Sequence, residues 1–152
     1  MPSSSPPDGG EDDTTTKGCA MERTISTLPL SGIRIELEGG GYTASIATVG
    51  ASLRRLRFGE RDLVVPFEEH EVRPFFRGAI LAPWPNRVVD GRYTFAGEER
   101  QLALTEPERG HALHGLVGWA DFAVVDAAPD RVELRAVIPA QLGYPHLSLI
   151  DI

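Results

Sequence analysis

Two short segments of this 152-residue chain carry the side chains best suited to chemistry. The first contains Trp84, Asn86 and Arg87 between apolar residues, and the second contains His111 and His114 between glycines. A tryptophan offers a flat face to a sugar ring, whereas amide and guanidinium groups donate hydrogen bonds to hydroxyls. Histidine adds a group that binds hydroxyls and exchanges protons. These residue types suit a site for a polar ligand.

The first segment, residues 78–88, is apolar but contains two prolines within three residues. Proline donates no hydrogen bond to a strand ladder, so a central strand is excluded here. We expect an irregular turn that carries Trp84, Asn86 and Arg87 between apolar anchors. Two interpretations remain open. In one, Trp84 packs and Arg87 pairs with an acid; in the other, the turn binds a polar ligand.

The second segment, residues 110–115, has two histidines three positions apart, which raises the possibility of a metal site. No Asp, Glu or Cys in this segment completes a set of ligands. Residues three apart in an extended stretch point to opposite faces, so His111 and His114 need not share a site. We predict no metal and no other cofactor. His114 is then a hydrogen-bonding or acid/base group, or simply a loop histidine.

Short alternating runs separated by glycines and turns surround these segments from Leu28 onward. The expected strands are residues 32–38, 42–49, 52–58 and 63–65, a hairpin of 92–95 with 100–104, and a hairpin of 119–127 with 131–138. No run of 12 residues shows a convincing helical period. Many short strands at close spacing predict an all-β fold, an antiparallel β-sandwich or barrel.

Composition excludes several classes of protein. A net charge of −7 argues against nucleic-acid binding through positive charge and against attachment to anionic membranes. No apolar run approaches the roughly 18 residues of a membrane span. A single cysteine rules out an internal disulfide framework. We therefore expect no nucleic-acid partner and no membrane partner.

The first 27 residues differ from the rest of the chain. They consist mainly of Ser, Pro, Gly, Thr and acidic residues. Such a segment buries too little apolar surface to offset the conformational entropy that it would lose on folding. We predict a disordered tail at residues 1–27 and a folded domain at 28–152. The tail lacks the basic start and apolar core of a secretory signal, so we expect a cytoplasmic protein.

Five motifs in order are similar to the aldose 1-epimerase (galactose mutarotase) family. They are GASL at 50–53, APWPNRVVDGRYTFAGEERQL at 82–102, HALHG at 111–115, Trp119, and QLGYP at 141–145. The resemblance covers about residues 33–152. It implies an antiparallel β-sandwich of the galactose-mutarotase-like supersandwich type, incomplete here because the family's fold is considerably longer.

The resemblance implies a reaction that interconverts the α and β anomers of a free hexose such as galactose or glucose. A base removes the C1 hydroxyl proton, an acid protonates the ring oxygen, and the opened ring recloses on its other face. By this resemblance, Asn86 and Arg87 bind sugar hydroxyls, and His114 hydrogen-bonds near the reacting centre. His111 stands where the family often has asparagine, which leaves it without a direct role.

The family's catalytic pair, a second histidine and a glutamate, lies beyond the Gly-Tyr-Pro motif and has no counterpart here. His146 lies too close to that motif to be the acid. We therefore expect no catalytic residue in this chain, and a truncated, N-terminal part of a mutarotase-like enzyme. The alternatives are a non-catalytic carbohydrate-binding β-sandwich and a metal-dependent enzyme that uses His111 and His114.

Overall fold

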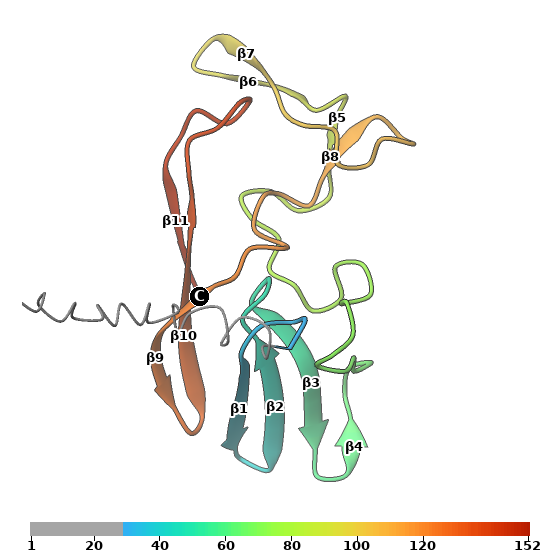
Figure 1. The fold of residues 1–152 in the computed structure, drawn as a ribbon, viewed down its shortest axis with the longest axis vertical. Coiled ribbons are helices and arrows are strands. Elements are labelled where there is room, and N and C mark those ends of the chain that lie inside the picture. The colour runs from blue at the N-terminus through green and yellow to red at the C-terminus, as the bar shows by residue number, and fades with distance from the viewer. Residues whose placement is uncertain (1–28) are drawn as a thin grey trace, which may run out of the picture.

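A computed structural model describes residues 29–152, and Figure 1 shows its fold. The predicted tail at residues 1–27 lies outside the described residues. The described part consists of strands and connections, and it holds no helix long and apolar enough to cross a membrane. Its strands are β1 (Arg34–Gly39), β2 (Tyr42–Ala47), β3 (Ser52–Phe58), β4 (Arg61–Asp62), β5 (Arg87–Val89), β6 (Arg92–Phe95), β7 (Glu98–Gln101), β8 (His111–Leu113), β9 (Ala123–Ala128), β10 (Arg131–Ile138) and β11 (Ser148–Asp151).

The first sheet has the order β1-β2-β3-β4, and its neighbouring strands are antiparallel. Alternation along the strands separates its two faces. Ile35 lies opposite Ile46 on the face that packs against the core, whereas Glu36 lies opposite Ser45 on the other face. The first three strands predicted from the sequence are therefore confirmed close to their expected bounds.

The strand predicted at residues 63–65 is wrong. The edge strand β4 contains only Arg61 and Asp62, and the chain leaves the sheet after Leu63, whose N–H still donates to the Leu56 carbonyl oxygen of β3 at 2.8 Å. Leu63 and Val65 are 45% and 68% exposed, so within residues 29–152 no neighbouring surface fully covers them. Strand propensity alone therefore does not show where this edge strand ends.

The second sheet has the order β11-β10-β9 and is also antiparallel. Leu134, Ala136 and Ile138 alternate along β10 and are buried. They belong to one apolar cluster, against which Ile35 and Ile46 of the first sheet also pack. The two sheets therefore share a core, and the predicted antiparallel β-sandwich is confirmed.

Both predicted hairpins are present, but their bounds differ from the expectation. The C-terminal hairpin begins at Ala123, later than expected, because Phe122 is buried and donates its N–H to the Thr48 carbonyl oxygen at 3.0 Å. The β6–β7 hairpin is closed by Ala96 and Gly97 alone rather than by four residues. Both have positive φ, 51° and 81°, which suits a tight two-residue turn.

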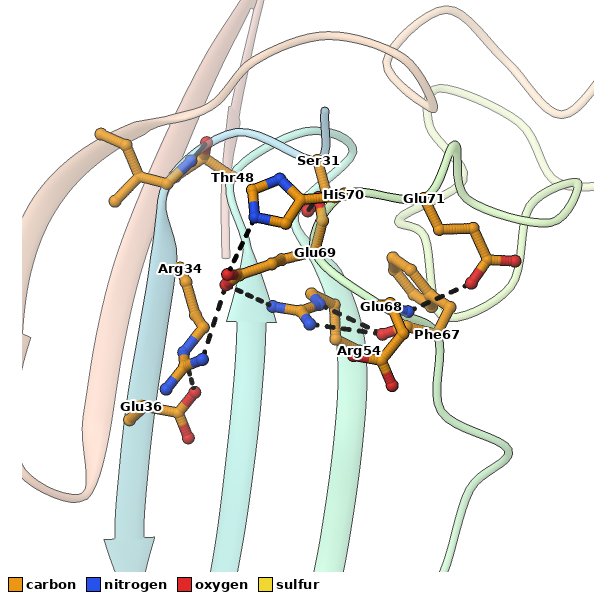
Figure 2. Close-up of polar contacts among 11 residues, drawn as sticks. Ser31, Arg34, Glu36, Thr48, Arg54, Phe67, Glu68, Glu69, His70 and Glu71 are labelled. Carbon is orange, nitrogen blue, oxygen red and sulfur yellow. Dashed lines mark hydrogen bonds and ion pairs between the residues drawn. The ribbon is translucent and has the colours of Figure 1, made fainter. Parts of the chain in front are cut away.

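One carboxylate ties the connection after β4 to the first sheet (Figure 2). The side chain of Glu69 lies 3.5 Å from Arg34 Nη1 and 3.9 Å from Arg54 Nη1. Its backbone oxygen accepts a hydrogen bond from Ser31 Oγ at 3.1 Å. The buried Arg54 also donates to the Phe67 carbonyl oxygen at 3.3 Å. This connection, which leads toward β5, therefore leaves the sheet from a fixed position.

Candidate functional site

The two segments singled out from the sequence pair with one another in the fold. β5 and β8 form a short antiparallel ladder, with Arg87 opposite Leu113 and Val89 opposite His111. Figure 1 shows this ladder near the β6–β7 hairpin, away from the β1–β4 sheet. Arg87 therefore begins a strand where the sequence predicted an irregular turn. A three-residue strand is too short for alternation to reveal it.

Two hydrogen bonds join Asn86 to His114 at one end of this ladder. The His114 N–H donates to the Asn86 carbonyl oxygen at 2.8 Å, and the Asn86 N–H donates to His114 Nδ1 at 2.9 Å. Because Nδ1 is an acceptor, the proton of the neutral imidazole is assigned to Nε2. Nε2 is then a donor suited to a ligand oxygen. Both residues have left-handed backbones, with φ of 58° and 59°.

Arg87 is held by Glu106 in a two-point ion pair. Arg87 Nε lies 2.6 Å from Glu106 Oε2, and Nη2 lies 2.8 Å from Oε1. Arg87 Nη1 donates to Asn86 Oδ1 at 3.0 Å. The hydrogen bond between the two side chains raises the pKa of Arg87 and holds the pKa of Glu106 below its ordinary value. These contacts use three of the five N–H groups of the guanidinium, so two remain for a ligand.

The three residues expected to contact a ligand are thus brought together by the fold, although 27 positions separate Arg87 from His114. Asn86 is the link, because its backbone binds His114 and its side chain binds Arg87. The ion pair with Glu106 also agrees with the interpretation in which Arg87 only pairs with an acid and binds no ligand. That these side chains bind a sugar remains a prediction.

Glu106 is a residue that the sequence did not assign to the site. It lies in the loop before β8, where its N–H donates to the His111 carbonyl oxygen at 3.0 Å. No periodicity distinguishes it from Glu108 in the sequence, because both belong to an irregular stretch. Only the pairing of β5 with β8 shows which of the two acids meets Arg87.

His111 takes a role similar to that of His114, at the other end of the ladder. Its Nδ1 accepts a hydrogen bond from the Asp90 N–H at 3.2 Å. The Nδ1 atom of each histidine therefore accepts a hydrogen bond from a backbone N–H, one at each end of β8. Among residues 29–152, no three His, Cys, Asp or Glu side chains are grouped in a way that would hold a metal ion.

Trp84 is half-buried, and its Nε1 is enclosed without a hydrogen-bond partner in the described structure. The residue borders a small hollow together with Leu102, Leu116 and Tyr144. This environment fits the interpretation in which Trp84 packs, rather than the one in which its face receives a ligand.

Gly115 fixes the distance between the His114 segment and the segment that leads to Asn86. It has a φ of +76°, and a Cβ atom at this position would lie 2.1 Å from the Ala82 backbone oxygen. The same oxygen accepts a hydrogen bond from the Leu116 N–H at 2.7 Å. Only glycine combines this backbone conformation with so close an approach.

The ring of Phe76 supports the His114 imidazole from the side. The two ring centroids are 4.8 Å apart, with an interplanar angle of 64°. Such edge-to-face contacts favour one orientation of the rings. His114 is thus held by the Asn86 amide and by the Phe76 ring.

Comparisons with known proteins agree with this fold. The sequence pattern of the family described as aldose 1-epimerase matches residues 34–148. The uncharacterized protein YihR of Escherichia coli K12 is 37% identical over 123 residues, which are 81% of this chain and 40% of that protein. A GalM/aldose epimerase homologue from C. elegans superposes with a TM-score of 0.69 at 27% identity, over 78% of this chain and 40% of its own.

A putative aldose 1-epimerase from Escherichia coli K12 superposes with a TM-score of 0.63 at 20% identity, over 72% of this chain and 38% of its own. At that identity the likeness supports the fold alone. The chain spans about 40% of the length of the relatives it matches. Since the family pattern covers most of its residues, the chain belongs to the aldose 1-epimerase family.

Proposed function

We propose that this chain provides sugar-contacting residues of a protein that interconverts the α and β anomers of a free hexose, such as galactose or glucose. One observation carries the proposal. Asn86 contacts both the Arg87 guanidinium and the His114 imidazole, so donors from distant parts of the sequence meet at one residue. Membership of the aldose 1-epimerase family supports a monosaccharide as the ligand.

Each of these side chains has a defined part in binding. The two N–H groups of Arg87 that remain free donate to hydroxyl oxygens of the sugar. The Nε2–H of His114 donates to an oxygen near the anomeric carbon. The ion pair with Glu106 and the bond to Asn86 hold the guanidinium in place before the sugar arrives, which lowers the entropy lost on binding.

Binding by these groups does not by itself explain a rate. Ring opening needs an acid at the ring oxygen and a base at the C1 hydroxyl, and each contributes about 10²–10⁴-fold. Contacts that are equally strong in the ground state and the transition state do not accelerate the reaction. We assign neither the acid nor the base to a residue of this chain. Its residues bind and orient the sugar.

The proposal is tested by titrating galactose and glucose into the isotope-labelled chain and following its amide signals by NMR. We expect the signals of Arg87, His114 and their neighbours to shift with one midpoint. Arg87→Met and His114→Ala should each weaken binding by about tenfold. Arg87→Met removes hydrogen bonds from a charged group, and His114→Ala leaves a sugar oxygen without its donor; each loss is worth about 1.5 kcal/mol.

Two matched variants serve as controls. His70→Ala removes an exposed imidazole that contacts Glu69 rather than the candidate site. Arg92→Met removes an exposed guanidinium from the neighbouring hairpin. Both should bind sugar as the unaltered chain does. Shifts that are absent with every hexose, or that survive both site variants unchanged, would show that these residues do not bind sugar.

A further inference from the structure

Trp119 is a large aromatic residue that is fixed in place and yet 53% exposed. It lies one ring away from the candidate site. The Phe76 ring that contacts His114 at 4.8 Å also lies 5.7 Å from the Trp119 ring, centroid to centroid. The Phe76 ring therefore lies against both the His114 imidazole and the Trp119 indole.

A buried arginine holds the Trp119 ring. The guanidinium carbon of Arg73 lies 4.3 Å from the ring centroid, and Arg73 itself is only 4% exposed. Arg73 Nη1 donates to Ser52 Oγ at 2.5 Å, Nε donates to the Phe75 carbonyl oxygen at 3.1 Å, and Nη2 donates to the Gly118 carbonyl oxygen. Within residues 29–152, its hydrogen-bond partners are a hydroxyl and carbonyl oxygens, with no carboxylate among them.

This arrangement prepares an aromatic surface in advance. The donors of Arg73 are bound to separate segments of the chain, so the cation cannot follow a moving ring. The contact between cation and ring stabilises one placement of the indole. A rigid aromatic ring loses little conformational entropy when a ligand covers it. Exposing such a ring costs stability unless something packs on it.

We propose that Trp119 is a further sugar-contacting residue, on which the apolar C–H face of the sugar held by Arg87 and His114 stacks. Arg73 is the positioning residue that keeps the ring in place. The inference rests on the function proposed above. One of the two interpretations left open by the sequence used Trp84 as the flat surface, whereas the structure encloses the Trp84 indole nitrogen and leaves Trp119 53% exposed.

The chain contains two tryptophans, so the experiment has an internal control. Each indole N–H gives one NMR signal, and Trp119→Phe identifies which is which. During titration with galactose or glucose, the Trp119 indole signal should shift with the same midpoint as the amides of Arg87 and His114. The Trp84 signal should stay in place.

Variants then measure the contribution of the ring. Trp119→Ala should raise the sugar dissociation constant by about fivefold, and Trp119→Phe by less, since a smaller aromatic ring remains. Phe95→Ala removes a similarly exposed aromatic residue, 55% exposed in the β6–β7 hairpin, and should change nothing. Arg73→Lys keeps the charge but not the planar donor group. It should move the Trp119 signal and weaken binding while the other amide signals retain their dispersion.

The outcomes separate this inference from the proposed function. If the amides of Arg87 and His114 shift while the Trp119 indole does not, stacking of the sugar on Trp119 is refuted and the proposed function stands. A shift of the Trp84 indole signal instead of the Trp119 signal also refutes stacking on Trp119. If no signal moves, both proposals fail. Once the two indole signals are assigned, the titration of the unaltered chain gives these answers even if Trp119→Ala or Arg73→Lys does not fold.

Discussion

Gly115→Ala adds one methyl group where the His114 segment meets the Ala82 segment, and we expect it to be far more damaging than its size implies. The new Cβ would lie 2.1 Å from the Ala82 backbone oxygen and 2.4 Å from the Ala82 carbonyl carbon. Both atoms belong to the backbone, so no side-chain rotation relieves the clash. One of the two segments must move.

The magnitude follows from two costs. An alanine in the left-handed region costs about 1–2 kcal/mol, and Gly115 has a φ of +76°. Moving the Ala82 oxygen breaks the hydrogen bond from the Leu116 N–H, and a buried donor left without a partner costs about 1–3 kcal/mol. Together these give about 2–5 kcal/mol, a large part of the roughly 5–15 kcal/mol that stabilises a typical domain.

Gly110→Ala is the matched control. Gly110 lies before β8, as Gly115 lies after it, and also has a positive φ, +68°. A Cβ atom at Gly110 would meet nothing within 4 Å. It carries only the backbone cost, about 1–2 kcal/mol. Urea denaturation of the two variants measures the difference in the free energy of unfolding. A Gly115→Ala protein no less stable than Gly110→Ala would refute the close approach on which the site's geometry depends.

Two further outcomes are expected from the site. Because the hydrogen bond with Arg87 holds the pKa of Glu106 below its ordinary value, the stabilisation from this pair is fully present above that ordinary value and is lost as the pH falls through the lower, folded-state pKa. In thermal denaturation, the melting temperatures of the unaltered chain and of Glu106→Gln should therefore differ at pH 6 and converge under strongly acidic conditions. A difference in melting temperature that stays the same at every pH would contradict the pairing. The 152-residue chain alone should not accelerate the mutarotation of α-D-glucose measured by polarimetry, since no acid and base are assigned to it; an acceleration abolished by His114→Ala would show that it holds its own catalytic pair.

The sandwich was predictable because strands such as β1 and β10 turn one apolar face toward the core. Ile35 and Leu37 alternate with charged residues in β1, and Leu134 alternates with charged residues in β10, so the period of two is visible in the sequence. The short edge strand β4 was not predictable in the same way. Leu63 and Val65 look like strand residues, but β4 ends at Asp62 and the two side chains are exposed.

The site was predictable only in part. The sequence identified Asn86, Arg87 and His114, but the contacts that hold them come from pairings between distant segments. Glu106 reaches Arg87 only because β5 lies beside β8. Arg73 resembles any surface arginine in the sequence, and its burial depends on carbonyl oxygens supplied by other parts of the chain. Local patterns do not encode such contacts.

The left-handed backbones of Asn86 and His114 restrict what evolution or a mutant library can place at these two positions. Glycine, asparagine and aspartate adopt that conformation readily, whereas valine and isoleucine do so at a high cost. A saturation library screened for folding alone should retain the first group and lose the second. His114→Asn then becomes the informative substitution, because it preserves the shape of the chain and removes only the imidazole. Sequence variation at these positions therefore reports the shape of the backbone as well as the chemistry of the side chains.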